Sequence, residues 1–418
     1  MQKKIQKQLN NAKNASIPFG LLSHAKRILI LKNIIKELKK NKKEIIQANL
    51  KDLNKISPYD QMRDRLILND ARILGMIQEI ENLIKMPDPI GEIFDYRENL
   101  GLKICKKRLP IGVIGVIYES RPNVTIDVAS ICIKSGNAVI LKGGKEARES
   151  NIVLHKIIKK ALILSKVNPE IIQFIDPKIK DSVLDIISAN SFIDVIIPRG
   201  SGELINFVRK NSLVPVIETG AGVCHTYVDE SAKIIPSAKI IFNAKTQRPS
   251  VCNALDTVLI HQKIAQKFIP EIAKLLKEKK VEIFAGTESY KILENIYPKN
   301  LLKKAKISDF GKEFLSQKIS VKIVSDIDEA IKFIQKYSSK HSEAILTENK
   351  KNADKFLQEV DSAVVYVNAS TRFSDGAIFK LGSEIGISTD KIHARGPMGA
   401  KEMTTYKWIV TGKYNTRK

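Results

Sequence analysis

The sequence predicts an α/β protein built on parallel β-sheets, with two α/β lobes, a hairpin and an extended C-terminal segment. From residue 111 onward, short apolar segments alternate with helical stretches of about 15–25 residues or fewer. The apolar segments are continuous β-branched runs and not alternating ones, which is typical of strands buried on both faces of a parallel sheet. The chain has 418 residues, 43% of them hydrophobic, so it can bury a large core over roughly two or three domains.

The first 85 residues are predicted to be helical. In residues 25–40 (AKRILILKNIIKELKK), apolar side chains recur at helical spacing with lysines opposite them. A basic amphipathic helix of this kind either lies on a membrane or packs against a domain, and packing is the commoner use. Pro87 and Pro89 end the helical pattern, and residues 91–107 are predicted as a hairpin with its turn at 98–101.

The two lobes follow the hairpin. Strands of the first lobe are expected at 111–118, 137–142, 171–175, 192–198 and 214–218. Strands of the second lobe are expected at 226–229, 256–261, 281–285, 321–324, 343–346 and 363–368, with a helix at 262–279 and a last extended segment at 404–411. In a doubly wound sheet, ligands bind beyond the carboxyl ends of the strands, so the residues that follow each strand are the candidates for a site.

Charge and composition exclude several classes of protein. The formal charge of +25 favours a polyanionic partner only if it is concentrated, but the lysines are scattered through nearly every segment, which is typical of a solvated basic surface. The four cysteines match neither a disulfide framework nor a CxxC motif, and the six histidines lack HExxH spacing, so no metal site is expected. The N-terminus lacks a secretory apolar region, and no apolar run approaches the roughly 20 residues of a membrane span. We therefore expect a soluble, cytoplasmic protein.

The usual phosphate-binding fingerprints are absent, so a dinucleotide would bind without the usual pyrophosphate turn. Asn123 lies in a strand-to-helix turn, where its amide either satisfies the local backbone or serves as an oxyanion donor. Lys145 is either a solvated lysine of a Gly-rich loop or a cation suited to a 2′-phosphate. Ser201 can cap the next helix, whose N–H groups can meet a phosphate. The glycines after Glu218 permit either a tight turn or close approach of a ligand.

Cys252 is the strongest candidate nucleophile, although an inert cysteine remains the alternative. It lies in a polar, turn-prone stretch between a helix and a strand, with Arg248 as a cationic neighbour that can favour the thiolate. Cys132 lies in an apolar helical run, where a core thiol is expected. Cys224 and His225 are adjacent in an extended segment, so their side chains should point apart.

Four ordered blocks resemble those of the gamma-glutamyl phosphate reductase family, in the aldehyde dehydrogenase superfamily, over nearly the whole chain. They are YESRPNVT (118–125), KTQRPSVCNA (245–254), VNASTRF (367–373) and KIHARGPMG (391–399). The resemblance implies an aldehyde dehydrogenase-like α/β fold in three parts. These are a Rossmann-like NADP-binding domain (1–91 and 110–222), an α/β catalytic domain (223–400) and a small β oligomerisation element (92–109 and 401–418).

The resemblance also implies a reaction: NADPH reduces L-glutamyl 5-phosphate to L-glutamate 5-semialdehyde and phosphate is released, in L-proline biosynthesis. Cys252 would be the nucleophile that forms a thioester, and Asn123 would stabilise the oxyanion. The implied cofactor residues are Lys142, Lys145, Gly200, Ser201 and Glu313, and the implied substrate residues are Arg121, Arg372 and Arg395. The chain would act as a homo-oligomer, without nucleic acid or membrane partners.

One departure concerns Glu218, which matches a glutamate that activates water in hydrolytic aldehyde dehydrogenases. Here the block is ETGAG, and a reductase must avoid hydrolysing its thioester, so Glu218 is given no role as a base. Two alternatives stay open. One is another acylating, NADP-linked aldehyde dehydrogenase, and the other is a basic nucleic-acid-binding protein.

Overall fold

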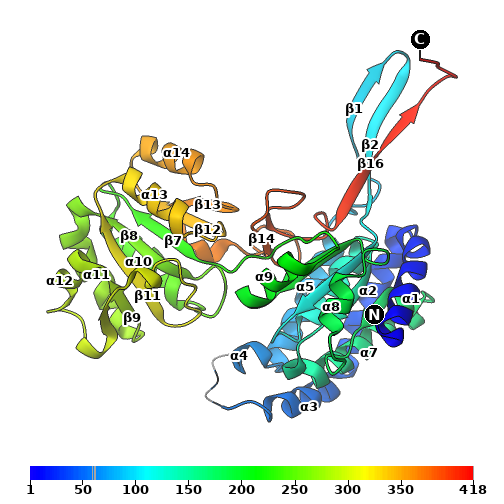
Figure 1. Ribbon diagram of the computed structural model, residues 1–418, viewed down its shortest axis with the longest axis horizontal. Helices are drawn as coiled ribbons and strands as arrows, with labels where there is room; N and C mark the ends of the chain where they lie inside the picture. The colour runs from blue at the N-terminus through cyan, green and yellow to red at the C-terminus, as the bar shows by residue number, and fades with distance from the viewer. Residues whose placement is uncertain (59, 61–62, 418) are drawn as a thin grey trace. The chain divides into compact units, whose positions relative to one another are not determined.

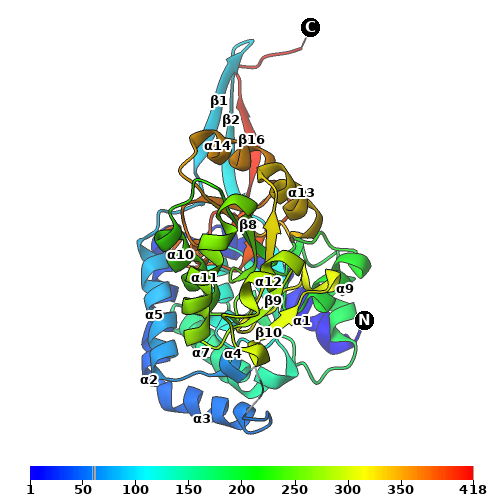
Figure 2. The same cartoon turned by 90° about the vertical axis from the view of Figure 1, so that its left-hand side faces the viewer.

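The computed structural model describes residues 1–58, 60 and 63–417, and the chain divides into two compact units. Unit 1 comprises Met1–Thr219, Lys380–Gly386 and Pro397–Lys418, and unit 2 comprises Gly220–Phe379 and Ile387–Gly396. In both views of the molecule, helices flank the strands of each unit (Figures 1 and 2). Compared with the expected division at 222/223 and 400/401, residues 380–386 and 397–400 belong to unit 1, and residues 220–222 belong to unit 2.

The central sheet of unit 1 is parallel and has the strand order β5-β4-β3-β6. Its strands are β3 (Val113–Tyr118), β4 (Ala138–Lys142), β5 (Ile172–Phe174) and β6 (Val195–Arg199). Every residue of β3 is buried, as the continuous apolar run predicted. The strand predicted at 214–218 is wrong: Val216 makes one bridge to Ile196, and Pro215 has no N–H with which to extend a ladder.

Helices surround this sheet, and those predicted for the N-terminal region are confirmed. They are α1 (Lys3–Gly20), α2 (His24–Lys40), α3 (Lys42–Leu53), α4 (Arg63–Leu66), α5 (Asp70–Lys85), α6 (Val124–Lys134), α7 (Arg148–Leu164), α8 (Ser182–Ile187) and α9 (Gly202–Asn211). The amphipathic helix α2 buries Ile30, Ile34 and Leu38 completely and packs on α7. Each such side chain contributes about 1.5–3 kcal/mol, so the apolar face of α2 belongs to the core.

Unit 1 also carries a three-stranded antiparallel sheet with the order β1-β2-β16. The predicted hairpin is confirmed as β1 (Ile93–Asn99) and β2 (Leu102–Pro110). The C-terminal strand β16 (Thr404–Thr411) pairs with β2, for example Tyr406 with Arg108 (Figure 1).

Unit 2 is built on a seven-stranded parallel sheet with the order β10-β9-β11-β8-β7-β12-β13. Its strands are β7 (Cys224–Val228), β8 (Leu255–His261), β9 (Glu282–Ala285), β10 (Leu302–Lys304), β11 (Lys318–Val324), β12 (Ser342–Leu346) and β13 (Val364–Val367). Its helices are α10 (Ile234–Thr246), α11 (Gln262–Glu278), α12 (Thr287–Leu293), α13 (Ile327–Tyr337) and α14 (Lys350–Glu359). The sequence missed only the short edge strand β10 of this sheet, because two of its three residues are exposed lysines and no apolar run marks it.

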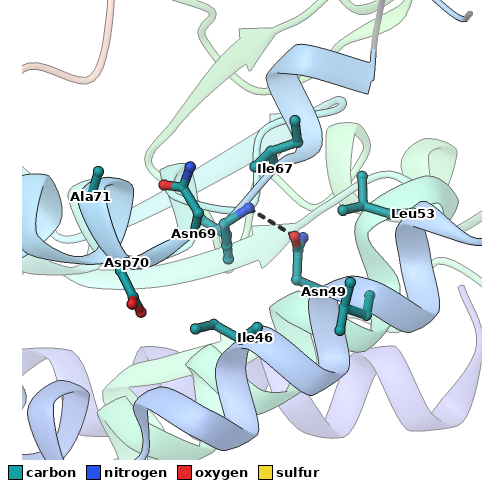
Figure 3. A pocket seen from close by; sticks show the side chains of 9 residues that line it. Ile46, Asn49, Leu53, Ile67, Asn69, Asp70 and Ala71 are labelled. Atoms are coloured by element: carbon teal, nitrogen blue, oxygen red, sulfur yellow. Dashed lines mark hydrogen bonds between the residues drawn. The ribbon is translucent and has the colours of Figure 1, made fainter. Parts of the chain in front are cut away.

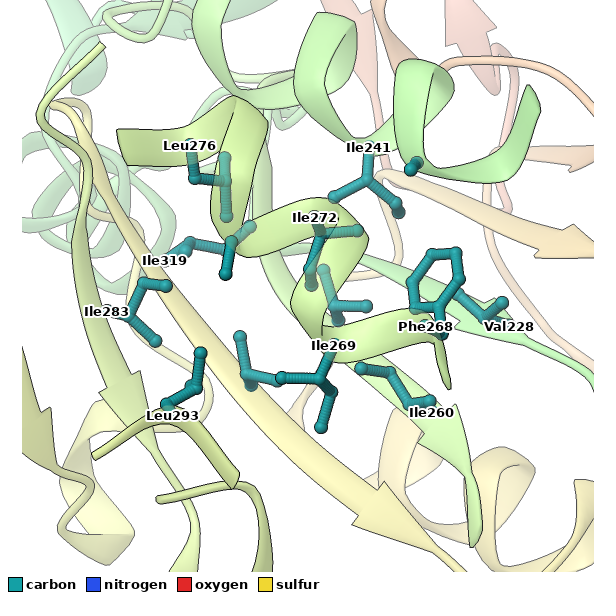
Figure 4. Packing of buried hydrophobic residues seen from close by; sticks show 14 of the residues in the cluster. Val228, Ile241, Ile260, Phe268, Ile269, Ile272, Leu276, Ile283, Leu293 and Ile319 are labelled. Atoms are coloured by element: carbon teal, nitrogen blue, oxygen red, sulfur yellow. The ribbon is translucent and has the colours of Figure 1, made fainter. Parts of the chain in front are cut away.

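The core of unit 2 lies between this sheet and α10 and α11. On α11, Phe268, Ile269 and Ile272 are almost completely buried and pack with Ile260 and Ile283 of the sheet (Figure 4). This packing fixes β8 and α10, and therefore both ends of the segment between them, which carries Cys252.

Several short elements complete the chain. Strands β14 (Ile387–Ser388) and β15 (Gly396–Pro397) pair with each other. Short 3₁₀ turns lie at Lys145–Ala147, Pro169–Ile171, Lys299–Leu301, Ile307–Asp309 and Thr371–Phe373. Among the described residues, no helix is both long and apolar enough to span a membrane.

Candidate functional site

The predicted site residues form two groups, one at the strand ends of unit 1 and one in unit 2. In unit 1, the segment after β3 carries Glu119, Arg121 and Asn123, and α9 begins after β6. Because β3 and β6 are neighbouring parallel strands, their carboxyl ends lie at the same edge of the sheet. The sequence-based placement of a ligand site at this edge therefore has a structural basis.

The start of α9 already holds an anionic group. Ser201 caps the helix, since its Oγ accepts a hydrogen bond from the N–H of Leu204 at 3.3 Å. The backbone N–H of Ser201 donates to Oε2 of Glu119 at 2.7 Å. A Cβ added to Gly200 would overlap the same carboxylate, so Gly200 permits this close approach. The predicted cap is confirmed, and the N–H group expected to meet a phosphate is occupied by a carboxylate.

Asn123 precedes α6 but does not cap it. Its backbone is helical, with φ −57° and ψ −30°, and its side chain accepts no capping hydrogen bond. Instead, Nδ2 of Asn123 donates to Oδ2 of Asp127 at 2.7 Å. The ordinary structural explanation for a turn asparagine, satisfaction of the local backbone, is therefore not the one that the structure shows.

Lys142 and Lys145 lie at the end of β4 and just after it. Burial lowers the pKa of Lys142, and the carboxylates of Glu146 and Glu119 oppose this effect. Lys145 is exposed, as a solvated lysine or a ligand-facing cation would be. The carboxylate of Glu146 is bonded to the protein's own backbone, because its Oε1 accepts a hydrogen bond from the N–H of Ser120 at 2.6 Å.

The second group surrounds Cys252, which lies between α10 and β8 as predicted. The thiol of Cys224 donates to the carbonyl oxygen of Cys252 at 3.3 Å. A Cβ added to Gly222 would overlap that same oxygen, so only glycine allows the segment 220–222 to pass beside the Cys252 backbone. The sequence had allowed either a tight turn or a close approach of a ligand at Gly220 and Gly222. At Gly222 the structure shows a close approach, and it is made to the chain's own backbone.

Arg372 is brought to the Cys252 segment from the far end of unit 2's sequence. Its Nε donates to Oε1 of Gln247 at 2.8 Å, and Nη1 donates to Oδ1 of Asn253. Nδ2 of Asn253 in turn donates to the carbonyl of Ser374 at 2.8 Å. Burial lowers the pKa of Arg372, and the charge of Cys252 acts in the opposite direction. A cation therefore lies close to the candidate nucleophile, and the charge of Arg248, the cation that the sequence had proposed, also acts on Arg372.

Glu313 contacts the segment 220–222, which passes beside the Cys252 backbone. Its Oε1 accepts a hydrogen bond from the backbone N–H of Gly222 at 3.0 Å. Beneath it lies a buried ion pair between Lys245 and Asp256, 3.5 Å apart, which the sequence did not reveal. Burial raises the pKa of Asp256 to about 6, and burial lowers the pKa of Lys245. Lys245 was visible within KTQRPSVCNA, but nothing local indicated that its ammonium group would be fully buried.

The other cysteines differ from Cys252. Cys132 is completely buried in α6, as predicted, and burial raises the pKa of its thiol. Cys224 is also completely buried, and burial together with the carboxylates of Glu343 and Asp256 raises the pKa of its thiol. His225 turns its Nδ1 towards Glu343 at 3.2 Å, so the prediction that Cys224 and His225 do not form a pair is confirmed.

Three further residues from the sequence analysis are Arg121, Arg395 and Glu218. Arg121 is half-buried in the turn after β3. Nη2 of Arg395 donates to Asp361 at 2.7 Å, and Lys391 pairs with the same carboxylate. Glu218 lies 3.4 Å from Nε of Arg209. The substrate roles of Arg121 and Arg395 stay predictions.

A pocket of about 470 Å³ opens elsewhere in unit 1, between α3 and the segment that leads into α5 (Figure 3). It is mainly apolar, and Oδ1 of Asn49 accepts a hydrogen bond from the N–H of Leu68 at 2.7 Å beside it. None of the predicted site residues lines this pocket. We therefore assign it no part in the chemistry.

Two units, each built on a parallel sheet with helices, define an α/β protein, and the second carries a cysteine in the segment before a strand. The family model described as "Aldehyde dehydrogenase family" matches residues 1–287. The chain belongs to the aldehyde dehydrogenase family. Members of this family use a nicotinamide cofactor, and the fold predicted from the resemblance is confirmed.

Relatives of the same length confirm the resemblance seen in the motifs. Gamma-glutamyl phosphate reductase of Chlorobium phaeobacteroides (strain BS1) is 47% identical over 418 residues, which is 100% of both chains. Gamma-glutamyl phosphate reductase of Legionella pneumophila (strain Philadelphia 1) is 48% identical over 413 residues, 99% of both chains.

Two solved structures are also similar to this chain. The crystal structure of gamma-glutamyl phosphate reductase from Thermotoga maritima has a TM-score of 0.93 and 42% sequence identity, and the match covers 100% of both chains. An acetylating aldehyde dehydrogenase from Geobacillus thermoglucosidasius, 17% identical, has a TM-score of 0.73 over 100% of this chain and 98% of its own. This second likeness shows the fold alone.

Proposed function

We propose that this chain reduces L-glutamyl 5-phosphate to L-glutamate 5-semialdehyde with release of phosphate, using NADPH, as a step of L-proline biosynthesis. The observation that carries the proposal is the set of full-length relatives of that name at 47–48% identity. The arrangement around Cys252 agrees with it, because a thiol with a neighbouring guanidinium is the group that this chemistry requires.

The first step is attack by the Cys252 thiolate on the acyl carbon of the substrate. The carbon–oxygen bond to phosphate breaks, phosphate leaves with the bonding electron pair, and a thioester forms on Cys252. Arg372, whose guanidinium is held by Gln247 and Asn253, favours the thiolate through its charge. Glu218 has no role as a base, so the thioester is not offered an activated water.

The oxyanion that develops during the attack is stabilised by the amide of Asn123 and the backbone N–H of Cys252. Removal of one such donor typically lowers the rate by about 10²–10³. The Cys252 backbone is held by the Cys224 thiol and by the close approach of Gly222. These contacts are made to the carbonyl group of the same residue.

The residues of unit 1 suit a phosphate-bearing cofactor, because the start of α9 already holds a carboxylate on the N–H of Ser201. We assign Gly200 and Ser201 to the pyrophosphate, Lys142 to the adenosine ribose and Lys145 to the 2′-phosphate of NADPH. Glu313, on the Gly222 N–H, is assigned to the nicotinamide ribose. When bound, the nicotinamide supplies the hydride that reduces the acyl group.

The substrate carries a phosphate and an α-carboxylate, and Arg121, Arg372 and Arg395 are proposed to bind them. Arg372 has the best structural support, since it lies at the Cys252 segment. The remaining positive charge belongs to the surface composition, and the proposed partners are small anions and not nucleic acid. The proposed setting is a cytoplasmic homo-oligomer that associates through the sheet of β1, β2 and β16.

The proposal is tested in the reverse direction, with glutamate semialdehyde, phosphate and NADP⁺, by the absorbance of the NADPH formed. The wild-type chain should turn over only when phosphate is present. Cys252→Ser should abolish turnover and leave NADPH binding intact, whereas the matched variant Cys132→Ser should stay active, because Cys132 lies in the core of α6. Inactivity of the wild-type chain with this substrate, together with activity on another acyl donor, would favour a different acylating dehydrogenase.

The cofactor assignment has its own test. Turnover with NADPH and with NADH is compared for the wild-type chain and for Lys145→Glu. If Lys145 binds the 2′-phosphate, Lys145→Glu should reduce the preference for NADPH over NADH by about tenfold or more. An unchanged preference would remove Lys145 from the site.

A further inference from the structure

Asn123 and Asp127 form a side-chain pair one helical turn apart at the start of α6. Nδ2 of Asn123 donates to Oδ2 of Asp127 at 2.7 Å, and the Asp127 residue is only 8% exposed. A side chain pair at this spacing stands on one face of the helix. Because Asn123 does not cap α6, this bond is the interaction that defines the direction of its amide.

The surroundings of Asp127 favour its neutral form. The charged groups that act on it come from three other elements: Glu79 of α5, Glu384 of the segment 380–386, and Arg199 at the end of β6. Burial and the neighbouring carboxylates of Glu79 and Glu384 raise the pKa of Asp127, and they outweigh the hydrogen bond from Asn123 and the charge of Arg199, which lower it. A protonated carboxyl group still accepts a hydrogen bond through its carbonyl oxygen.

The neutral form suits a residue beside a developing oxyanion. A carboxylate close to the amide of Asn123 would repel the negative charge that forms on the acyl oxygen. A neutral carboxyl group orients the amide without this repulsion. The amide nitrogen carries two N–H bonds, so one of them can bond Asp127 while the other faces the substrate.

We propose that Asp127 is a positioning residue for the reductase reaction, holding the amide of Asn123 so that its second N–H points at the acyl oxygen. The inference rests on the proposed function, in which Asn123 is an oxyanion donor. Preorganised donors are effective because they need no reorientation as the charge develops. An amide without this contact would have to be ordered in every turnover.

The test is a double-mutant cycle on Asn123 and Asp127, with steady-state kinetics in the reverse direction. Asp127→Ala should lower kcat by about 10–100-fold, while KM for the semialdehyde and the dissociation constant of NADPH change less than threefold. Asn123→Ala should lower kcat by about 10²–10³-fold. If Asp127 acts through Asn123, adding Asp127→Ala to Asn123→Ala should lower kcat no further.

The conservative variant Asp127→Asn separates orientation from charge. An asparagine can present its carbonyl oxygen to Asn123 and, like the protonated carboxyl group, carries no charge. We expect it to keep kcat within threefold of the wild-type value. Thermal unfolding of each variant identifies any loss of folded protein, and Asp127→Asn remains informative if Asp127→Ala is unstable.

The outcomes distinguish the role of Asp127 from the oxyanion role of Asn123 and from the proposed reaction. Additive losses in the double variant, an unchanged kcat in Asp127→Ala, or a kcat of Asp127→Asn as low as that of Asp127→Ala would each overturn the role of Asp127. An unchanged kcat in Asn123→Ala would instead refute the oxyanion assignment on which the inference rests. Absence of phosphate-dependent turnover in the wild-type chain would refute the proposed function itself.

Discussion

Oε2 of Glu119 accepts a hydrogen bond from the backbone N–H of Ser201, at 2.7 Å, where α9 begins. The positive end of a helix attracts anions, so this carboxylate lies where we propose that a cofactor phosphate binds. The two residues are far apart in the sequence and meet because β3 and β6 are neighbours. A phosphate that binds at this helix must displace Glu119.

Glu119→Gln is therefore expected to tighten the binding of NADPH. A charge-assisted hydrogen bond is roughly twice as strong as a neutral one, so a glutamine side chain should be easier to displace from the Ser201 N–H than the carboxylate. The dissociation constant of NADPH should therefore fall about five- to tenfold. Glu203→Gln is the matched control, because it removes a carboxylate from the same turn of α9. Titration of NADPH fluorescence measures both. Weaker binding in Glu119→Gln would mean that this carboxylate contacts the cofactor directly.

Gly222→Ala is expected to lower turnover at least tenfold. The new methyl group would overlap the carbonyl oxygen of Cys252, so the Cys252 backbone must move, and misplacement of a nucleophile is costly. The free energy of unfolding should also fall, by about 1–3 kcal/mol. Gly75→Ala is the control: a Cβ there meets nothing within 4 Å, and the helix α5 should gain up to about 1 kcal/mol. Wild-type turnover in Gly222→Ala would contradict the close approach.

Arg372→Lys is expected to raise KM for the anionic substrate about tenfold. Lysine cannot reproduce the planar fork with which Arg372 bonds Gln247 and Asn253, so its charge would be placed differently. The dissociation constant of NADPH should not change. The same substitution at Arg121 and Arg395, measured in parallel, shows which guanidinium binds the substrate. A larger rise in KM at Arg395 than at Arg372 would contradict the proposal that Arg372 is the main substrate-binding arginine.

The stability of unit 1 should depend on pH through His155 of α7. Burial lowers the pKa of His155 to about 4, and its Nε2 lies 3.2 Å from the carbonyl of Ile172. Between pH 6.5 and about 4, the unfolded chain binds a proton at His155 that the folded chain does not, so the free energy of unfolding falls as the pH falls. His155→Phe should remove about 2–3 kcal/mol of this fall in denaturant titrations at the two pH values. An identical pH dependence in the two proteins would show that His155 titrates normally when folded.

Local patterns predicted the larger part of the architecture. The continuous apolar runs marked β3 and β4, because a strand buried on both faces needs apolar side chains at nearly every position. The polar, turn-prone stretch between a helix and a strand marked the place of Cys252. No strand forms at 214–218, because Pro215 has no N–H to donate to the neighbouring strand. The sequence alone did not show that this N–H would be needed, since the need depends on the partner strand.

The sequence by itself determined the fold class, the family and the candidate nucleophile, because hydrophobic periodicity and short ordered motifs are local properties of the chain. The tertiary structure alone decided the contacts within each group: Glu119 on Ser201, Gly222 against Cys252, and the burial of Lys245 with Asp256. It also decided that Asn123 bonds Asp127 and leaves α6 uncapped. The physical reason is that parallel strands bring distant segments together at one edge of a sheet, where burial and neighbouring charge, and not residue type, determine what each side chain contacts.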